Sequence, residues 1–305
     1  MPERFGRDGI LVGVDGSEHS HSAVRWAVRE ALMRSVPLDL IHIVTTPLRG
    51  WGGLGLVTTP LPEDFGVIQE ERGRQVIDQA MRVVDASAGS GKLTVHTRVF
   101  FCPPVPTLIE LSGLARMVVV GSRGYGALRR GLLGSVSTAL VHHAHCPVAV
   151  IHDDTILPNT LSHAPVLVGI DGSPGSELAT AIAFEEASWR GVELVALHAF
   201  TDADRLDYIP GAPWPDAQSV AEETLAERLA GWQERYPDVI VHRVVVAEHP
   251  ARHLLDHSES AQLLVVGSHG RGGFAGMQLG SVANAMVHAA HIPVIVARPR
   301  TPIAE

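Results

Sequence analysis

The sequence predicts an α/β protein made of two tandem, doubly wound (Rossmann-like) domains. Two observations carry this prediction: short apolar runs alternate with longer segments of helical period, and the whole pattern occurs twice along the chain. Strands that are apolar on consecutive residues and separated by helices are typical of a parallel sheet with helices on both faces. We therefore expect one five-stranded parallel sheet in each half of the chain.

Four sequence landmarks of the first half return in the second half. They are LVGVDGS at 11–17 and LVGIDGS at 167–173, VVVGSRG at 118–124 and LVVGSHG at 264–270, LGSV at 133–136 and 279–282, and HCPV at 145–148 and HIPV at 291–294. The early landmarks are 156 positions apart and the late ones 146, so the first copy is ten residues longer in its middle. Copies of this length are too long to be solenoid repeats. We expect a first domain at 1–152, a linker at 153–164 and a second domain at 165–305.

Residue periodicity places the elements within each copy. The expected strands are 10–14, 38–44, 93–99, 117–120 and 148–151 in the first copy, and 166–170, 192–199, 239–246, 263–266 and 293–297 in the second. Helices are expected at 67–88, 106–114 and 135–145, and another is marked by Ala23, Ala27 and Ala31, whose spacing puts them on one helix face. The last strand of each copy is a candidate sheet edge, through which the copies pair with each other or with a second chain.

Composition and charge argue against several classes of function. The chain has 305 residues and a formal net charge of −9. An acidic protein gains no counterion release from duplex phosphates, so we expect no nucleic-acid partner. No apolar stretch approaches the roughly 20 residues of a membrane span, and the first residues lack the apolar core of a secretory signal. The two cysteines form no CxxC pair. We therefore expect a cytoplasmic protein without a membrane span, disulfide framework or cysteine-rich zinc site.

A glycine pattern follows the fourth strand of each copy. Gly121-Ser-Arg-Gly124 is followed after nine residues by Gly134-Ser135, and Gly267-Ser-His-Gly270 is followed at the same spacing by Gly280-Ser281. A phosphate needs several N–H groups aimed at one point, and glycine lets the backbone approach it. Each Gly-Ser pair begins a helix, whose unpaired N–H groups favour an anion. The alternative is a set of ordinary turn glycines with a serine N-cap.

An aspartate follows the first strand of each copy, at Asp15 and Asp171. The first and fourth strands of a doubly wound sheet are neighbours, so we expect each aspartate and its glycine pattern to face one crevice. The carboxylate could then accept hydrogen bonds from an adenine amine or a ribose hydroxyl, while Gly13 and Gly169 let a ligand approach the strand end. The alternative for the aspartates is a helix cap or an Asx-turn.

These elements together resemble the universal stress protein family. The resemblance rests on the pattern G-x2-G-x9-G-S, on VDGS and IDGS after the first strands, and on LIHI at 40–43 and ALHA at 196–199, and it covers nearly the whole chain twice. The chain resembles the tandem members of this family that occur in actinobacteria. This resemblance implies the ATP-binding branch of the family, with strand order 3-2-1-4-5 in each sheet. It also implies a homodimer, a role in stress or dormancy, and a regulatory use of one bound ATP per domain, with or without Mg²⁺.

The resemblance assigns roles residue by residue. It implies Asp15 and Ile43 at the adenosine and Gly121, Gly124, Gly134 and Ser135 at the phosphates of the first copy, with Asp171, Ala199, Gly267, Gly270, Gly280 and Ser281 as their matches in the second. Their neighbours Gly13, Ser122, Arg123, Val136, Gly169, Ser268, His269 and Val282 complete the candidate nucleotide contacts. Asp202 is a further candidate contact, because its carboxylate could bind a ribose hydroxyl. The alternative is that Asp202 is a solvated acidic residue of a loop. Arg123, Arg129 and Arg130 favour a more highly charged phosphate in the first copy if they turn inward, and are otherwise solvated.

Other motifs give weaker indications. No G-K-[ST] follows the glycines, so there is no Walker A lysine, efficient hydrolysis is not expected and no catalytic residue is assigned. His142, His145 and Cys146 share a helix face, but the second copy lacks the thiol, so we expect no metal site. His249, His253 and His257 are interpreted as a solvated helix face, and Trp26, Trp189 and Trp232 as core. His42 and His198 are interpreted as hydrogen-bonded core histidines. The long segments 46–66 and 202–216 are either lids or interfaces, or plain excursions.

Overall fold

The computed structural model describes residues 8–45, 65–124, 133–152, 163–200, 214–272 and 278–300. Within these ranges lie ten strands: β1 Ile10–Gly13, β2 Leu38–Val44, β3 Val95–Phe101, β4 Met117–Gly121, β5 Val148–Ile151, β6 Val166–Ile170, β7 Leu194–Phe200, β8 Val241–Ala247, β9 Leu263–Gly267 and β10 Val294–Ala297. The same ranges contain eight helices: α1 Glu18–Arg34, α2 Phe65–Ala88, α3 Pro104–Ser112, α4 Ser135–His143, α5 Pro174–Arg190, α6 Trp214–Arg235, α7 Pro250–Ser258 and α8 Ser281–Ala289. The expected strands 38–44, 148–151 and 166–170 have these bounds, and the others are displaced by one or two residues.

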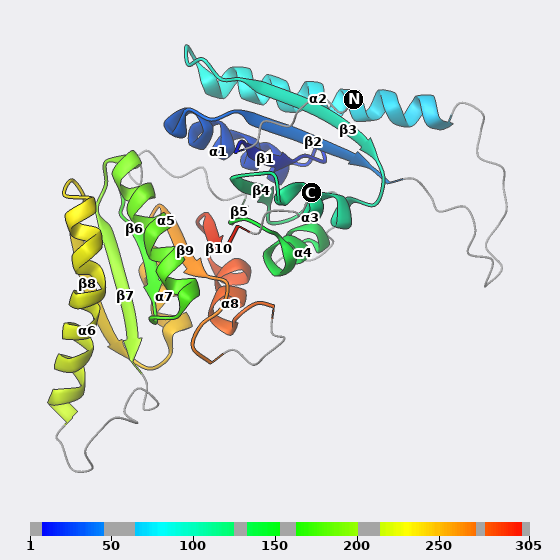
Figure 1. The fold of residues 1–305 in the computed structure, drawn as a ribbon. Helices are drawn as coiled ribbons and strands as arrows, with labels where there is room; N and C mark the ends of the chain where they lie inside the picture. The colour runs from blue at the N-terminus through cyan, green and yellow to red at the C-terminus, as the bar shows by residue number, and fades with distance from the viewer. Residues whose placement is uncertain are drawn as a thin grey trace, which may run out of the picture.

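All ten strands of the described ranges join one sheet, in the order β3-β2-β1-β4-β5-β10-β9-β6-β7-β8 (Figure 1). Each copy therefore has the order 3-2-1-4-5, and the pairings inside each copy are parallel. The fold class expected from the sequence is confirmed, with the difference that the two five-stranded sheets are continuous.

The two copies meet at β5 and β10, which pair antiparallel with Ala149 opposite Ile295. Antiparallel pairing of equivalent strands, flanked by mirrored strand orders, relates the copies by an approximate two-fold axis through this seam. The candidate edges named from the sequence are thus used within the chain. Of the two alternatives, pairing with each other is the one that the structure shows.

Helices cover both faces of the sheet. Buried residues of α1, α2, α5 and α6 form one hydrophobic core, and those of α3, α4, α7 and α8 form the other. Ala23, Ala27 and Ala31 are fully buried in the first core, as their spacing predicted. On β1 the alternating side chains of Ile10 and Leu11 enter opposite cores, which is how a strand of consecutive apolar residues serves both layers.

Three helices of the first copy begin or end differently from the expectation, and α2 starts two residues early, at Phe65. Helix α3 starts at Pro104 instead of 106, because a proline in the first turn lacks only an N–H that this turn leaves unpaired. Helix α4 ends at His143 instead of 145, with Ala144 in extended conformation. The next N–H, that of His145, donates to Ser112 Oγ at 2.8 Å and so cannot continue the helix.

A buried ion cluster joins α1 to α5 across the seam. Arg34 pairs with Glu30 of its own helix at 3.2 Å and with Glu186 of α5, while Arg190 pairs with Glu186 at 3.0 Å and with Glu30. Burial raises the pKa of Glu30 to about 7, against the attraction of Arg190. The Arg34 guanidinium also lies 4.1 Å from the ring centre of Trp189. Trp189 was expected in the core but is 37% exposed, because it lies at this junction.

Candidate functional site

The turn between β1 and α1 carries Asp15 and is fixed from two sides. His42 Nδ1 donates to the carbonyl of Val14 at 2.8 Å, and His198 does the same for Ile170 at 2.7 Å in the second copy. These histidines are hydrogen-bonded within the strands, as expected. Asp15 Oδ1 accepts from the N–H and hydroxyl of Ser17 at 3.0 and 2.6 Å. The aspartate therefore forms an Asx-turn that starts α1, whatever else it contacts.

The matching turn of the second copy also forms a hydrogen bond with its glycine loop. Asp171 Oδ1 accepts from Ser173 N at 2.9 Å, and its Oδ2 accepts from Arg271 N, directly after Gly270 in the second glycine pattern, at 3.1 Å. Burial acts to raise the pKa of the Asp171 carboxyl, but the hydrogen bonds from Ser173 and Arg271 outweigh it and lower that pKa. The carboxylate is thus ionised and shared between the first-strand turn and the glycine loop.

Each glycine pattern closes on itself. Gly134 N–H donates to the carbonyl of Ser122 at 2.8 Å, and Gly280 N–H donates to that of Ser268 at 2.7 Å. The bond brings the two ends of the pattern together: a Cβ built on Gly280 would lie 3.5 Å from the nitrogen of Gly270. Backbone from both ends of the pattern therefore lines one small surface.

The glycines at the strand ends also allow close contact with the start of the first helix. A Cβ on Gly121 would lie 2.7 Å from the carbonyl carbon of His19, and one on Gly270 would lie 2.5 Å from Asp171 Oδ2. The aspartate and the glycine loop of each copy thus come together, as the neighbouring first and fourth strands predicted. By contrast, a Cβ on Gly13 or Gly169 would face Leu108 or Leu254, so these glycines adjoin a packed helix.

The helices that follow the patterns have uncapped N-termini. The N-cap residues are Gly134 and Gly280, both in extended conformation and without a side-chain cap. Ser135 and Ser281 are the first residues of α4 and α8 and are exposed, so the serine N-cap alternative is wrong. First-turn N–H groups without a capping side chain attract anions through hydrogen bonds and the helix dipole. Ser137 Oγ donates to the Gly121 carbonyl at 2.7 Å and holds α4 against the end of β4.

Ser122, inside the first glycine pattern, has a buried hydroxyl group that is unpaired within the described part of the chain. It is 2% exposed, and its Oγ has no hydrogen-bond partner among the described residues. Its counterpart Ser268 lies 3.1 Å from His269 Nδ1. Because nearly all buried hydroxyls are hydrogen-bonded, a ligand or water next to the loop is the ordinary explanation for such a group.

The other candidate residues are placed as follows. Ile43, Val136 and Val282 are partly buried and pack on the hydrophobic core shared by α3, α4, α7 and α8, and Ala199 is partly exposed on β7. Arg123 is partly exposed beside Gly124. Asp202, Arg129, Arg130 and nearly all of the long segments 46–66 and 202–216 lie outside the described residues.

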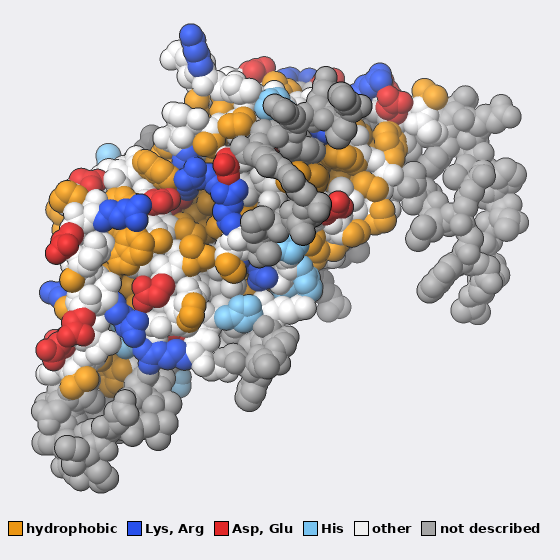
Figure 2. All heavy atoms as spheres, in the orientation of Figure 1, with side chains coloured by type: hydrophobic (Ala, Val, Ile, Leu, Met, Phe, Trp, Pro, Cys, Tyr) orange, Lys and Arg blue, Asp and Glu red, His pale blue; other side chains and the backbone are white. Residues whose placement is uncertain are grey.

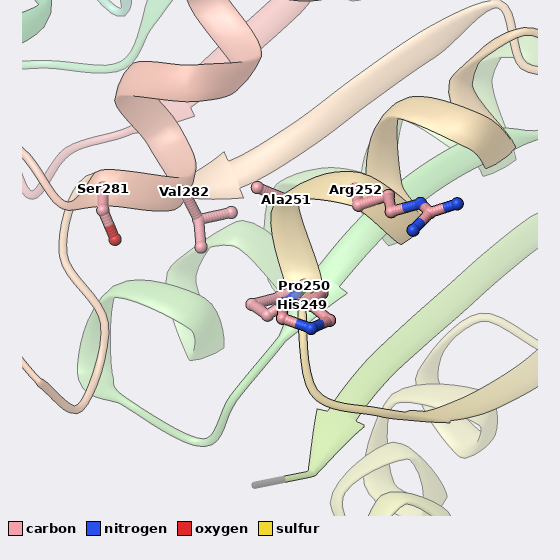
Figure 3. Close-up of a pocket in the computed structure, with 6 residues that line it drawn as sticks. All are labelled: His249, Pro250, Ala251, Arg252, Ser281 and Val282. Atoms are coloured by element: carbon pink, nitrogen blue, oxygen red, sulfur yellow. The ribbon is translucent and has the colours of Figure 1, made fainter.

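A cavity of about 430 Å³ lies between the starts of α7 and α8 in the second copy (Figure 3). It is lined by His249, Pro250, Ala251, Arg252, Ser281 and Val282. His249 precedes α7, so its interpretation as part of a solvated helix face is wrong. Both Glu248 and His249 have positive φ, 51° and 46°, which costs a non-glycine residue about 1–2 kcal/mol. The equivalent Pro103 is extended, so only the second copy has this turn. Nothing in the sequence indicated this turn.

Histidine side chains gather on the surface over α4 and α8 (Figure 2). Burial, and then the neighbouring His143 and Arg298, lower the pKa of His142, and His288 of α8 contributes in the same direction. Burial raises the pKa of the Cys146 thiol to about 12.

Across the described ranges, no group of three or more His, Cys, Asp or Glu side chains is placed to hold a metal ion. In the same ranges no helix has the length and apolarity that a bilayer crossing needs.

Known proteins resemble this chain over nearly its whole length. The model of the universal stress protein family matches twice, over residues 6–152 and 163–298. The chain belongs to the universal stress protein family. The chain is 56% identical over 292 residues to universal stress protein Rv2005c of Mycobacterium tuberculosis, covering 95% of this chain and 97% of that protein. Universal stress protein Rv2623 of the same organism is 52% identical over 292 residues, covering 95% and 96%.

Solved structures of universal stress proteins share the tandem fold. The crystal structure of a universal stress protein from Archaeoglobus fulgidus matches with a TM-score of 0.71 and 22% identity, covering 97% of this chain and 100% of that chain. At this identity the likeness concerns the fold alone. The expected family is therefore confirmed, as is its tandem two-domain organisation.

Proposed function

We propose that this universal stress protein binds ATP, one molecule per domain, and acts as a nucleotide-dependent regulator of stress response, growth or dormancy. We propose domains at 1–152 and 165–305, joined by a linker at 153–164. The observation that carries the proposal is the closed glycine pattern beside an uncapped helix N-terminus, present in both copies. Backbone N–H groups from two directions suit the oxygens of a phosphate chain.

The binding mode follows from this arrangement. In the first copy the phosphates lie against Gly121, Ser122, Gly124 and Gly134 and against the first turn of α4, where the Ser122 hydroxyl gains its missing partner. The adenosine lies toward Asp15 and Ile43. The second copy binds its nucleotide equivalently, with Asp171 and Ala199 at the adenosine and Asp202 as the proposed ribose contact. The cavity at Ser281 and Val282 supports an accessible phosphate end in that copy. ATP binds with or without Mg²⁺.

We propose binding without efficient turnover. A phosphoryl-transfer enzyme needs a cation at the leaving phosphate and a group that orients the nucleophile. Neither glycine pattern contains a Walker A lysine, its basic side chains being arginines, and no side chain of either pattern is assigned to orient a nucleophile. The second candidate function, a slow ATPase or adenylyl-transfer enzyme on the same sheet, is tested by measuring turnover. We also propose a homodimer in the cytoplasm, and because β5 and β10 pair within the chain, its interface uses another surface.

Substitution of the exposed helix-start serines tests the nucleotide sites. Ser135→Glu and Ser281→Glu each place a carboxylate where phosphate would bind, so ATP affinity at that site should fall at least tenfold by charge repulsion. An acidic residue at a helix start is stabilising by about 0.3–1 kcal/mol, so the melting temperature should hold or rise. These variants are sharper than Gly124→Glu, because a side chain at Gly124 would collide with the Asp15 carboxylate.

Isothermal titration calorimetry with ATP gives the stoichiometry and both affinities. We expect two sites in the wild type, one in each single variant and none in the double variant. Gly231→Glu is the matched control, because Gly231 lies on α6 with no atom within 4 Å of a built Cβ. A wild type that binds no adenine nucleotide at millimolar concentration, or a double variant that still binds two, would refute the proposal.

A further inference from the structure

Arg298, directly after β10, joins the two copies on the face opposite the ion cluster. Its Nε donates to the carbonyl of Ala144 at 2.7 Å, and its Nη1 donates to those of Val141 at 2.9 Å and Gln278 at 3.2 Å. Val141 and Ala144 form the C-terminal end of α4 in the first copy. Gln278 lies two residues before Gly280 in the glycine pattern of the second copy. One guanidinium therefore bridges a helix of one copy and the glycine pattern of the other.

The donor and the acceptors of this bridge are electrostatically complementary. The last carbonyls of a helix lack partners and carry the negative end of its dipole, so a cation there is favourable. Arginine presents several N–H donors in a fixed planar arrangement, and can hold carbonyls from two elements at once. Arg298 is partly buried, and this burial lowers the pKa of its guanidinium without depriving it of charge at neutral pH.

The helix that Arg298 caps is the one that starts at the first nucleotide site. Helix α4 begins at Gly134 and Ser135 and spans nine residues, about 13 Å at 1.5 Å per residue. Its N-terminus is held to β4 by the Ser137 hydroxyl, and its C-terminus is held by Arg298. A rigid path of packed helix and hydrogen bonds therefore runs from the first phosphate position to the second glycine pattern.

We propose that Arg298 is a positioning residue for the second nucleotide site and makes its affinity depend on occupancy of the first. The inference rests on the proposed function, since it concerns how the two nucleotide sites communicate. Displacement of α4 by phosphate at its N-terminus moves the carbonyls that Arg298 holds. The Gln278 carbonyl follows, and with it the Gly280 N–H that closes the second loop onto Ser268.

Two variants distinguish this positioning role from a general contribution to the stability of the β5–β10 junction. Arg298→Ala removes all three hydrogen bonds. His152→Ala is the matched control: His152 occupies the equivalent position after β5, and its Nε2 donates to the Val287 carbonyl of α8 at 3.2 Å. This control removes a cross-seam contact at a helix end but leaves the contact of Arg298 with Gln278 intact.

Calorimetry with ATP on the full chain measures the effect site by site. We expect Arg298→Ala to weaken the second site, isolated by Ser135→Glu, by roughly tenfold, and to leave the first site, isolated by Ser281→Glu, within twofold. Filling the first site in the wild type should change the second affinity, and in Arg298→Ala it should not. Equal weakening of both sites, or an unchanged second site, would overturn the proposal. If Arg298→Ala does not fold, Arg298→Lys is judged by the same criteria, because its single ammonium cannot reproduce the planar contacts.

Hydrogen exchange of the ligand-free protein tests the bridge without any nucleotide. The amide of Gly280 should exchange faster in Arg298→Ala than in the wild type and in His152→Ala. Unchanged exchange at Gly280 would contradict the positioning role even if ATP binds. Failure of ATP binding in the wild type, with faster exchange in Arg298→Ala, would instead refute the proposed function and leave the bridge standing as a structural fact.

Discussion

Replacing Glu30 by glutamine should make the protein more stable at alkaline pH and leave it nearly unchanged at pH 5. Glu30 is fully buried in the ion cluster, and burial raises its pKa from the usual 4.5 to about 7, with Glu186 adding to the rise and Arg190 and Arg34 opposing it. A carboxyl whose pKa is raised in the folded state contributes stability that is present below pH 4.5. This stability is lost as the pH rises through 7.

The size of the effect follows from the rise in pKa. A change from 4.5 to about 7 corresponds to roughly 3 kcal/mol of unfolding free energy between the two ends of this pH window. Glutamine keeps the shape and one oxygen acceptor of the protonated acid but carries no charge at any pH. The two proteins should therefore agree within about 1 kcal/mol at pH 5, and the variant should be more stable by up to roughly 3 kcal/mol at pH 8.

Urea denaturation at pH 5, 6, 7 and 8, followed by circular dichroism, measures this difference directly. Glu70→Gln serves as the control, because Glu70 forms an exposed pair with Arg74 and its loss should change stability by less than about 1 kcal/mol. The reasoning is refuted if Glu30→Gln is about 3–5 kcal/mol less stable at pH 8, the usual cost of breaking a buried ion pair. That result would mean that Arg34 and Arg190 keep Glu30 ionised.

Three further outcomes rest on single contacts. Ser17→Ala removes the side chain that caps Ser20 N in α1, and should lower the unfolding free energy by about 1 kcal/mol in urea denaturation; no change would show that the cap contributes nothing. Leu140→Ala leaves a void in the second core and should cost about 2–5 kcal/mol in the same assay, whereas a cost below 1 kcal/mol would contradict the tight packing at this position. Ser137→Ala frees the Gly121 carbonyl and should weaken ATP binding at the first site only, so equal weakening of both sites in calorimetry would count against this local role.

The elements near the proposed site could be predicted because each is governed by local chemistry. The run at 38–44 is mostly apolar and rich in Ile, Leu and Val, which favours a buried strand, and the structure gives it those bounds. The approach of Asp15 to Gly124 follows from the order of strands in a doubly wound sheet. The start of α3 was missed by two residues, because both Pro104 and Pro106 can occupy the first turn of a helix, and the sequence does not tell which of them begins it.

The ion cluster beside the seam and the second-copy cavity could not be predicted, for a different reason. Glu30 and Arg190 are 160 positions apart, and nothing in a charged helix face tells which distant charge will neutralise it. Trp189 was taken for a core residue because it falls on an expected helix, while its actual neighbour is Arg34 of the other copy. The turn at His249 depends on a backbone conformation that glycine would signal but histidine does not.

The antiparallel junction of β5 and β10 has a consequence for how the two halves can differ. Two separate chains meeting edge to edge would have to find each other in solution, and their association would fade on dilution. Here a short tether holds the edges at a local concentration in the millimolar range, so the pair persists at any protein concentration. A separate-chain dimer would also receive every substitution twice. In the fused arrangement an arginine can stand after one edge strand and a histidine after the other, as Arg298 and His152 do, and each half can specialise independently.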